Sequence, residues 1–377
     1  MPPKSREEIT SKVLRRLEST PYAASSLDPL SGGTANFIYR APLLKPLDDG
    51  TKEILIKHSE DFLANSPSFK LTLSRCHVEE KCLKVLSDFP ISVKADSSSP
   101  YNYTVRTAKF FHYDKKNHTQ VQEYLPNSCD LKAYAINTYG GPTPETLRPQ
   151  CFQLGVALGR WLRSFHDWAG QQSELRKTVT ANKEMQQLKH MINFAWLYDQ
   201  LKNNFPSVAG GAQGVFEAVK KMAAAELENE SQLQVVHGDF WSGNILLPKA
   251  PIQEGVDVPM FVIDWETAQL GVPNLDLGQM IAELYELKIY KKITAGLWMV
   301  QGFTEGYGEV SEDFAFRTAI QVGAHLICFG TTVEGWGTPE QIKDVARIGK
   351  ETVVHAWQKD RSWFEGGDLA CLFSKIQ

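Results

Sequence analysis

A carboxylate and an amide stand five positions apart in VVHGDFWSGNILLP, residues 235–248. The apolar ends of this segment predict two short strands, so Asp239 and Asn244 would lie in the turn where both strands end. Such a turn can hold a carboxylate still for chemistry, and it can also be a purely structural, hydrogen-bonded turn. Asp264 follows the apolar run of FVIDWE and is a second carboxylate at a predicted strand end. Oxygen-bearing side chains from adjacent strand ends can hold a hard divalent cation, because such ions prefer oxygen ligands.

Two features earlier in the chain are suited to phosphate groups. The segment SGGTAN, residues 31–36, precedes a predicted strand, and its glycines allow backbone N–H groups to approach phosphate oxygens. Lys57 lies between apolar neighbours in the predicted strand EILIKHS, and a lysine on an inner face needs a neutralising partner. The alternatives are an ordinary hairpin turn for the glycines and an edge-strand lysine that faces water. The loop residues concerned are Gly32, Gly33, Thr34 and Asn36.

The next predicted helix, over about residues 70–87, offers a partner for Lys57. Glu79 stands four residues before Leu83 and seven before Leu86, close to the apolar stripe of this helix. Glu80 would point further round, towards solvent, so the spacing favours Glu79. Both glutamates could instead be solvated, which is the more common arrangement for such a pair.

The order of these features along the chain indicates their chemistry. A glycine-rich loop, a strand lysine, a helix glutamate, a D-x-x-x-x-N pair and a strand-end aspartate follow the layout of kinase-type phosphoryl transfer. In that chemistry Lys57, oriented by Glu79, would hold the α- and β-phosphate oxygens of ATP. Asn244 and Asp264 would bind Mg²⁺, and Asp239 would align the acceptor hydroxyl and receive its proton. The sequence therefore predicts an ATP- and Mg²⁺-dependent phosphotransferase.

Composition places the chain among ordinary globular proteins. Its 377 residues suffice for two lobes or one large domain, and 42% hydrophobic with 22% charged residues exclude disordered and fibrous classes. A net charge of -4 gives no sign of a nucleic-acid footprint. The six cysteines have no CxxC pair or metal-finger spacing and are expected to be reduced thiols. Because the chain has neither a secretory-type N-terminus nor the roughly twenty apolar residues needed to cross a bilayer, we expect a cytoplasmic protein without membrane contact.

The kind of periodicity changes along the chain. The first 125 residues alternate short apolar strands with one or two helices, beginning with a helix whose capping box is Ser5 with Glu8. From about residue 150 the pattern is mostly helical, and a helix start at Thr338 is marked by Pro339 and Gln341. We expect an α+β, two-lobed fold: a β-rich N-lobe over 1–125 that covers the nucleotide, and a mostly helical C-lobe over 126–377 with the catalytic and metal loops and the substrate-binding part. The longer helical segments are predicted at 183–203, 211–228, 275–300, 311–330 and 338–358.

At these residues the chain resembles the aminoglycoside phosphotransferase/choline kinase family. HGDFWSGNILL and VIDWETAQLGVPNLDLGQM carry the resemblance, which extends over most of residues 27–360. Within the family the chain is most similar to methylthioribose kinase-like and hydroxytryptamine kinase-like members. The resemblance implies a protein-kinase-like fold with ATP in a cleft, a hinge from Glu123 to Leu125, and a scaffolding role for His237 in the catalytic loop. Asp276 could be a helix-cap carboxylate or a support for the catalytic loop, and we favour the support.

Other readings remain open at this level. A protein kinase is disfavoured because no A-P-E segment follows a D-F-G, and Trp-Glu follows Asp264 instead. A catalytically inactive nucleotide-binding module would predict loss of a chemical residue, whereas the lysine, both aspartates and the asparagine are present. His166, which ends an apolar helix stripe, is expected to be a buried histidine with satisfied hydrogen bonds. A box for a cationic amine could also form, although aromatic residues on helices are mostly core; its members would be Trp298, Phe329, Glu334 and Trp336.

Overall fold

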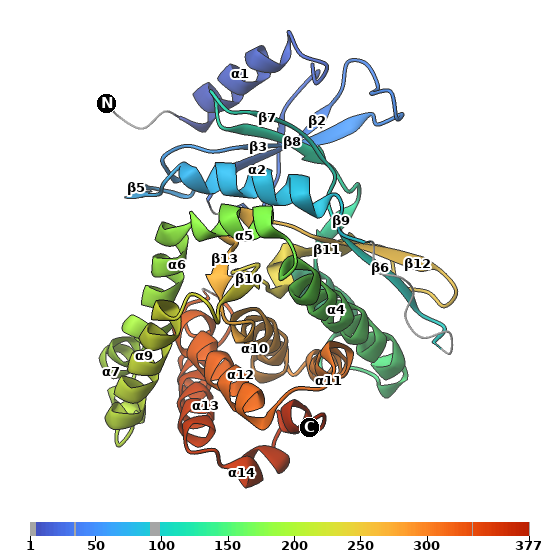
Figure 1. Ribbon diagram of the computed structural model, residues 1–377. Coiled ribbons are helices and arrows are strands. Elements are labelled where there is room, and N and C mark those ends of the chain that lie inside the picture. Colours follow the sequence, from blue (N-terminus) through green and yellow to red (C-terminus); the bar gives the residue numbers. More distant parts are fainter. Residues whose placement is uncertain (1–4, 34, 91–98, 334, 377) are drawn as a thin grey trace. The chain divides into compact units, whose positions relative to one another are not determined.

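The computed structural model describes residues 5–33, 35–90, 99–333 and 335–376 (Figure 1). The chain divides into two compact units. The first comprises Met1–Asp88 and Thr107–Pro126, and the second comprises Phe89–Arg106 and Asn127–Gln377. Residues 89–106, which the sequence assigned to the N-lobe, therefore belong to the second unit. The α+β class is confirmed, because the first unit is built on an antiparallel sheet and the second is mostly helical.

The sheet of the first unit is five-stranded and antiparallel, in the order β1-β2-β3-β8-β7, and a separate ribbon pairs β4 with β5. Strand β3 carries Lys57 opposite Gln120 of β8. The described elements are α1 (Arg6–Leu17), β1 (Asp28–Pro29), β2 (Phe37–Pro42), β3 (Glu53–His58), β4 (Phe62–Leu63), β5 (Ser66–Lys70), α2 (Ser74–Leu86), β7 (Phe110–Asp114) and β8 (Thr119–Glu123).

Helix α1 begins at the capping box that its sequence predicts. The Ser5 hydroxyl accepts a hydrogen bond from the Glu8 N–H, and the Glu8 carboxylate accepts one from the Ser5 N–H. Three residues at helical spacing, Ile9, Val13 and Leu17, are buried in one hydrophobic core with side chains of β2, β3 and β8. The helix thus closes one side of the core of the first unit.

Two small sheets of the second unit position its polar loop residues, and both come from segments far apart in sequence. One sheet has the order β6-β12-β11-β9, and the other pairs β10 with β13. Strand β10 ends just before His237, β11 begins just after Asn244, and β12 ends two residues before Asp264. The bounds are β6 (Asn102–Thr107), β9 (Ser128–Asp130), β10 (Gln234–Val236), β11 (Ile245–Pro248), β12 (Asp257–Val262) and β13 (Gln269–Gly271).

Helices make up most of the second unit, and α10 packs against both α11 and α12 (Figure 1). Within the described ranges no helix is both long and apolar enough to span a bilayer. The helices are α3 (Leu131–Tyr139), α4 (Arg148–Ala169), α5 (Ser173–Thr180), α6 (Lys183–His190), α7 (Leu197–Asn204), α8 (Pro206–Ala209), α9 (Gln213–Glu228), α10 (Asn274–Lys291), α11 (Ala295–Tyr307), α12 (Glu312–His325), α13 (Pro339–Trp357) and α14 (Arg361–Glu365).

Predicted segment 275–300 is wrong in extent and 183–203 is interrupted at Trp196, whereas 211–228, 311–330 and 338–358 match the observed helices closely. The segment 275–300 breaks at Lys292, a left-handed residue (φ 57°) whose N–H bonds to carbonyls of the last turn of α10. Segments 183–203 and 311–330 contain the π-helical turns Met191–Ala195 and Leu326–Gly330. The apolar pattern continues through these segments, so it gave no sign of the break or of the π-helical turns.

Helices α4 and α11 approach each other through glycines. A β-carbon on Gly302 of α11 would lie 1.9 Å from the backbone oxygen of Phe152, and one on Gly155 of α4 would lie 2.2 Å from that of Met299. Real β-carbons do not approach so closely, so only glycine permits this separation. This helix contact also positions a neighbour of the loop after β10. The ring centroids of Phe303 in α11 and Phe240 in the loop are 6.3 Å apart.

Gly302→Ala should lower the free energy of unfolding by about 2 kcal/mol, because the added methyl group must push two backbones apart. Gly214→Ala is the matched control: Gly214 lies in α9, and a β-carbon added there would meet nothing within 4 Å. That control should be neutral or stabilising by about 0.5–1 kcal/mol, since alanine favours helix. Urea unfolding followed by circular dichroism measures both, and equal stability of the two variants would contradict the close helix contact.

Candidate functional site

In the first unit, Lys57 and Glu79 form a buried ion pair. The Lys57 Nζ lies 2.7 Å from Glu79 Oε1, and both side chains are almost fully buried. Gln120, opposite Lys57 in the sheet, donates a hydrogen bond of 3.0 Å to Glu79 Oε2. Both carboxylate oxygens are therefore bonded, which fixes the ammonium group at the inner face of β3.

Glu80 does not point to solvent as its spacing predicted. It is 2% exposed, and its Oε1 accepts a 2.6 Å ion-paired hydrogen bond from Lys84, one helical turn later. Helical spacing places Glu79 and Glu80 about 100° apart, and α2 is covered over a wide enough arc to bury both. The structure thus pairs Glu79, and not Glu80, with Lys57.

The glycine-rich turn contains two glycines with different constraints. Gly32 has φ 106°, a conformation that other residues rarely adopt, and a β-carbon on Gly33 would lie 2.7 Å from the Ile38 side chain. Thr34 lies outside the described residues. Asn36 is buried, and its side-chain oxygen accepts hydrogen bonds from Ser59 Oγ (2.6 Å) and Arg75 Nη2 (3.2 Å). Its oxygen thus stabilises the base of the loop.

The expected hinge lies at the end of β8. The Glu123 carboxylate accepts a hydrogen bond of 2.9 Å from the Lys109 N–H, and the Glu123 N–H donates to the Lys109 carbonyl at 2.8 Å. Leu125 follows in a half-buried stretch outside the strand. The Glu123 side chain therefore ties β8 to the segment that enters β7.

In the second unit, Asp276 at the start of α10 holds the loop after β10. Its carboxylate is fully buried and accepts hydrogen bonds from the N–H groups of His237 (2.8 Å) and Gly238 (2.9 Å). It also contacts His166 Nε2 at 3.1 Å, and the other ring nitrogen of His166 lies 3.0 Å from the Tyr307 hydroxyl. The expectations of a supporting Asp276 and a satisfied, buried His166 are confirmed.

His237 is the second element that shapes this loop. Its Nδ1 accepts a hydrogen bond from the Asp239 N–H at 3.2 Å, and its Nε2 donates to the Ile263 carbonyl at 3.0 Å. Burial lowers the pKa of His237 despite the opposing effect of nearby carboxylates, so the ring is neutral. A neutral ring with its proton on Nε2 links the loop to the end of β12 in one fixed geometry.

The Asp239 carboxylate is held at both oxygens. Lys189 Nζ lies 2.6 Å and Gln279 Nε2 lies 2.7 Å from Oδ1, and Asn244 Nδ2 lies 3.1 Å from Oδ2. Burial alone would raise the pKa of Asp239, but the charge and hydrogen bond of Lys189, followed by the Gln279 hydrogen bond, lower it to about 2. Asp239 is therefore a fixed, ionised carboxylate at neutral pH.

Asn244 and Asp264 lie at adjacent strand ends. Ile245 pairs with Val262 across β11 and β12, and the Ile263 N–H bonds to the Asn244 carbonyl at 3.0 Å. Asp264, one residue further, has a left-handed backbone (φ 68°), which is uncommon outside glycine and asparagine and typical of functional sites. Asn244 uses its amide nitrogen for the bonds to Asp239. Its amide oxygen and the Asp264 carboxylate are both oxygen ligands of the kind that Mg²⁺ prefers.

Two contacts of Asp239 come from residues that the motif analysis missed. Gln279 lies three residues after Asp276 on the same face of α10, so helical spacing could have indicated it. Lys189 comes from α6, 50 residues before Asp239, and no sequence pattern marked it. It is 9% exposed and lies in an amphipathic helix whose other lysine, Lys183, faces water.

The aromatic residues are used differently from the predicted amine box. Trp336 lies under the Lys132 ammonium at 4.1 Å, and Lys132 also pairs with Glu283 at 2.9 Å. Phe329 faces a different cation, Lys189, at 5.6 Å. Trp298 is buried in α11, and Glu334 lies outside the described residues. The two rings thus contact different lysines of the chain.

Comparison with known proteins decides the family. The sequence matches the phosphotransferase enzyme family (APH) over residues 98–296, just over half of the chain. The chain belongs to this family. It is therefore a phosphotransferase, as the order of its motifs predicted.

Individual relatives of this phosphotransferase resemble it along nearly the whole chain. Phosphotransferase FrzJ from Cladobotryum sp is 28% identical over 368 residues, and 94% of each chain is covered. A 4-hydroxytryptamine kinase from Psilocybe cyanescens is 24% identical, with 95% of each chain covered. The crystal structure of a choline/ethanolamine kinase family protein from Mesorhizobium loti has a TM-score of 0.50 at 12% identity and covers 97% of this chain and 99% of that chain. The protein-kinase-like fold is confirmed by this likeness.

Lys189→Met should destabilise the phosphotransferase by about 2 kcal/mol at pH 7, because a partly buried carboxylate loses its charged partner. The folded-state pKa of Asp239 is depressed to about 2, below an unfolded value of about 3.9, so the stabilisation is present above the unfolded value and is lost as pH falls through the folded one. The difference between wild type and variant should therefore shrink to about half at pH 3. Urea unfolding at pH 7, 5 and 3 measures it.

Lys183→Met is the control on the same helix, since Lys183 pairs with Glu230 at an exposed position. It should change stability by less than about 0.5 kcal/mol at every pH. A loss for Lys189→Met that does not depend on pH would argue that packing, and not the ion pair with Asp239, explains its effect.

Proposed function

We propose that this phosphotransferase moves the γ-phosphoryl group of ATP to a hydroxyl group of a small-molecule acceptor, with Mg²⁺ as the activating ion. The observation that carries the proposal is the Asp239 carboxylate, ionised and bonded at both oxygens beside a hard-cation donor set. The names of the relatives are consistent with it, because a 4-hydroxytryptamine kinase and a choline/ethanolamine kinase act on small hydroxylated amines by name.

In this proposal the first unit holds the nucleotide. Lys57, oriented by Glu79, would donate to α- and β-phosphate oxygens, as a strand lysine does in kinase chemistry. Backbone N–H groups of the turn with Gly32 and Gly33 would approach the phosphates, where side chains would obstruct them. Adenine would be met by backbone groups between Glu123 and Leu125.

In the second unit, Asn244 and Asp264 would hold Mg²⁺ through their side-chain oxygens. The ion, when bound, neutralises charge on the phosphate oxygens. The left-handed backbone of Asp264 supports this role, because a strained residue at a strand end is retained where its side chain must be aimed in one direction.

Asp239 would align the acceptor hydroxyl and receive its proton. A carboxylate whose pKa is about 2 is a weak base at neutral pH, so its contribution is mainly alignment. The proton would transfer as the acceptor oxygen bonds to the γ-phosphorus and the bond to the ADP oxygen breaks. A weak base is sufficient for phosphoryl transfer. In the transition state the acceptor hydroxyl loses little of its proton until its oxygen bonds to the γ-phosphorus.

Asp239→Asn should lower turnover about a thousandfold, or ~4 kcal/mol of barrier, while ATP affinity stays nearly unchanged. ADP release against a panel of hydroxylated small molecules, including 4-hydroxytryptamine and choline, identifies the acceptor, and the variant serves as its blank. Near-normal turnover of the variant would remove Asp239 from this role. Phosphorylation of a protein but of no small molecule would refute the acceptor class.

Lys57→Met should lower kcat/KM for ATP about a hundredfold, because a charge-assisted contact to phosphate is lost. Lys84→Met is the matched control in the same unit: it removes an ion pair with Glu80 without touching Lys57. Steady-state kinetics with varied ATP measures both. An unchanged kcat/KM in the Lys57 variant, or an equal loss in the control, would contradict the phosphate role.

A further inference from the structure

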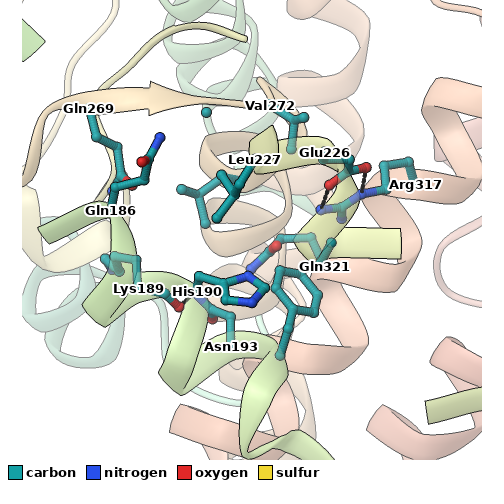
Figure 2. A pocket seen from close by; sticks show the side chains of 14 residues that line it. Gln186, Lys189, His190, Asn193, Glu226, Leu227, Gln269, Val272, Arg317 and Gln321 are labelled. Carbon is teal, nitrogen blue, oxygen red and sulfur yellow. Dashed lines mark hydrogen bonds and ion pairs between the residues drawn. The ribbon is translucent and has the colours of Figure 1, made fainter. Parts of the chain in front are cut away.

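A small pocket in the second unit has a residue that contacts Asp239 in its lining. Figure 2 shows the side chains that line this pocket. It lies among α6, the π-helical turn Met191–Ala195, α9, α10 and α12, has a volume of about 40 Å³, and is named here the α6–α12 pocket. Lys189 is part of its lining, and the Nζ of Lys189 is 2.6 Å from Asp239 Oδ1. A group bound in the pocket would therefore be one side chain away from the carboxylate proposed to meet the acceptor hydroxyl.

Buried polar groups without partners line this pocket. Gln321 of α12 is fully buried, and neither its Oε1 nor its Nε2 bonds to any described residue. Asn193 is 2% exposed: its nitrogen donates to the Lys189 carbonyl at 3.0 Å, but its oxygen has no partner among the described residues. The same holds for Arg317 Nη1, one turn before Gln321. Native proteins leave few such groups unpaired, because a buried polar group that has lost its bonds to water without gaining others destabilises the fold.

The π-helical turn that supplies Asn193 is a second sign of function. Such turns are rare, occur as single insertions in α-helices and are found frequently at functional sites. This one begins at Met191, directly after α6, and supplies Asn193 and Phe194 to the pocket lining. Figure 2 shows His190 of α6 and Asn193 of the turn beside Gln321.

The charges around the pocket compensate each other. Arg317 makes two hydrogen bonds with Glu226, of 2.7 and 2.9 Å, and Lys189 is paired with Asp239. Burial, followed by the charge of Lys220, lowers the pKa of His190, so its ring is neutral at neutral pH. The pocket thus offers hydrogen-bond donors and acceptors but no unbalanced charge.

We propose that the α6–α12 pocket binds an uncharged polar end of the acceptor, an amide, lactam or similar group that both donates and accepts hydrogen bonds. Gln321 offers one donor and one acceptor, Asn193 a further acceptor and Arg317 a further donor. The volume equals about three water molecules, so the pocket takes a group of a few heavy atoms while the hydroxyl lies at Asp239. This assignment rests on the proposed function. The competing occupant is ordered water alone.

Gln321→Met tests the pocket. Saturation-transfer NMR measures the binding of acetamide, the probe, to the full-length wild type and to the variant. The variant keeps the length of the side chain and removes the amide. Acetamide should bind the wild type and not the variant, whose melting temperature should stay equal or rise because no unpaired amide remains buried. A structural role for Gln321 would instead lower the melting temperature.

Ala223→Leu tests the same pocket by filling it, since Ala223 is a buried lining residue of α9. Ala225→Leu is its control on an exposed position of the same helix, outside the lining. The first variant should lose acetamide binding and the second should keep it. Because the two pocket variants act at different sites, either one decides the outcome if the other does not fold.

Kinetics separate this inference from the proposed function. With an amide-bearing acceptor from the panel, kcat/KM for the acceptor should fall about a hundredfold in Gln321→Met, with KM for ATP unchanged. Equal acetamide binding in wild type and Gln321→Met, or none in the wild type, would overturn the inference and leave phosphoryl transfer untouched. Acetamide binding without phosphorylation of any small molecule would refute the proposed function, and the acceptor assignment with it.

Discussion

The backbone of the loop between β10 and β11 depends on one carboxylate that water does not reach. A buried carboxylate is unfavourable by several kcal/mol unless its oxygens are bonded. Asp276 meets that requirement with the N–H groups of His237 and Gly238 and the ring of His166. The loop backbone supplies the hydrogen bonds that stabilise the buried Asp276 carboxylate, and the carboxylate in turn holds the loop in its conformation. The direction in which Asp239 leaves the loop follows from it.

Helix α10 extends this arrangement along its length. Its polar residues 276, 279 and 283 recur at a spacing of three and four, so they share one face of the helix. That face is buried and not solvated: Gln279 bonds to Asp239, and Glu283 contacts the Ser242 hydroxyl at 3.5 Å. These three side chains therefore come from one rigid helix. A rigid helix positions side chains around the loop more precisely than three separate loops would.

Each unit also contains a buried lysine whose charge is compensated by a carboxylate. Lys57 with Glu79 and Lys189 with Asp239 are held at 2.7 and 2.6 Å. In a site of low dielectric constant, fixed charges of this kind act on a polyanionic ligand without reorganisation during the reaction. Each ammonium group is thus held against one carboxylate oxygen, the arrangement that the proposed phosphate binding and hydroxyl alignment would use.

The α+β class, the order of the kinase-type motifs and the strand ends that carry Asn244 and Asp264 could all be predicted from the amino-acid sequence. These features are local: an apolar run predicts a buried strand, and a polar residue directly after it must lie at the strand end. Three other features became visible only in the folded chain: Lys189 meets Asp239, Glu80 is buried, and Gln321 faces a pocket. Each of these depends on which helices pack together across long separations in the chain. The apolar periodicity of a sequence indicates which face of a helix is buried. It does not indicate which residues cover that face, so partners from distant helices cannot be predicted from it.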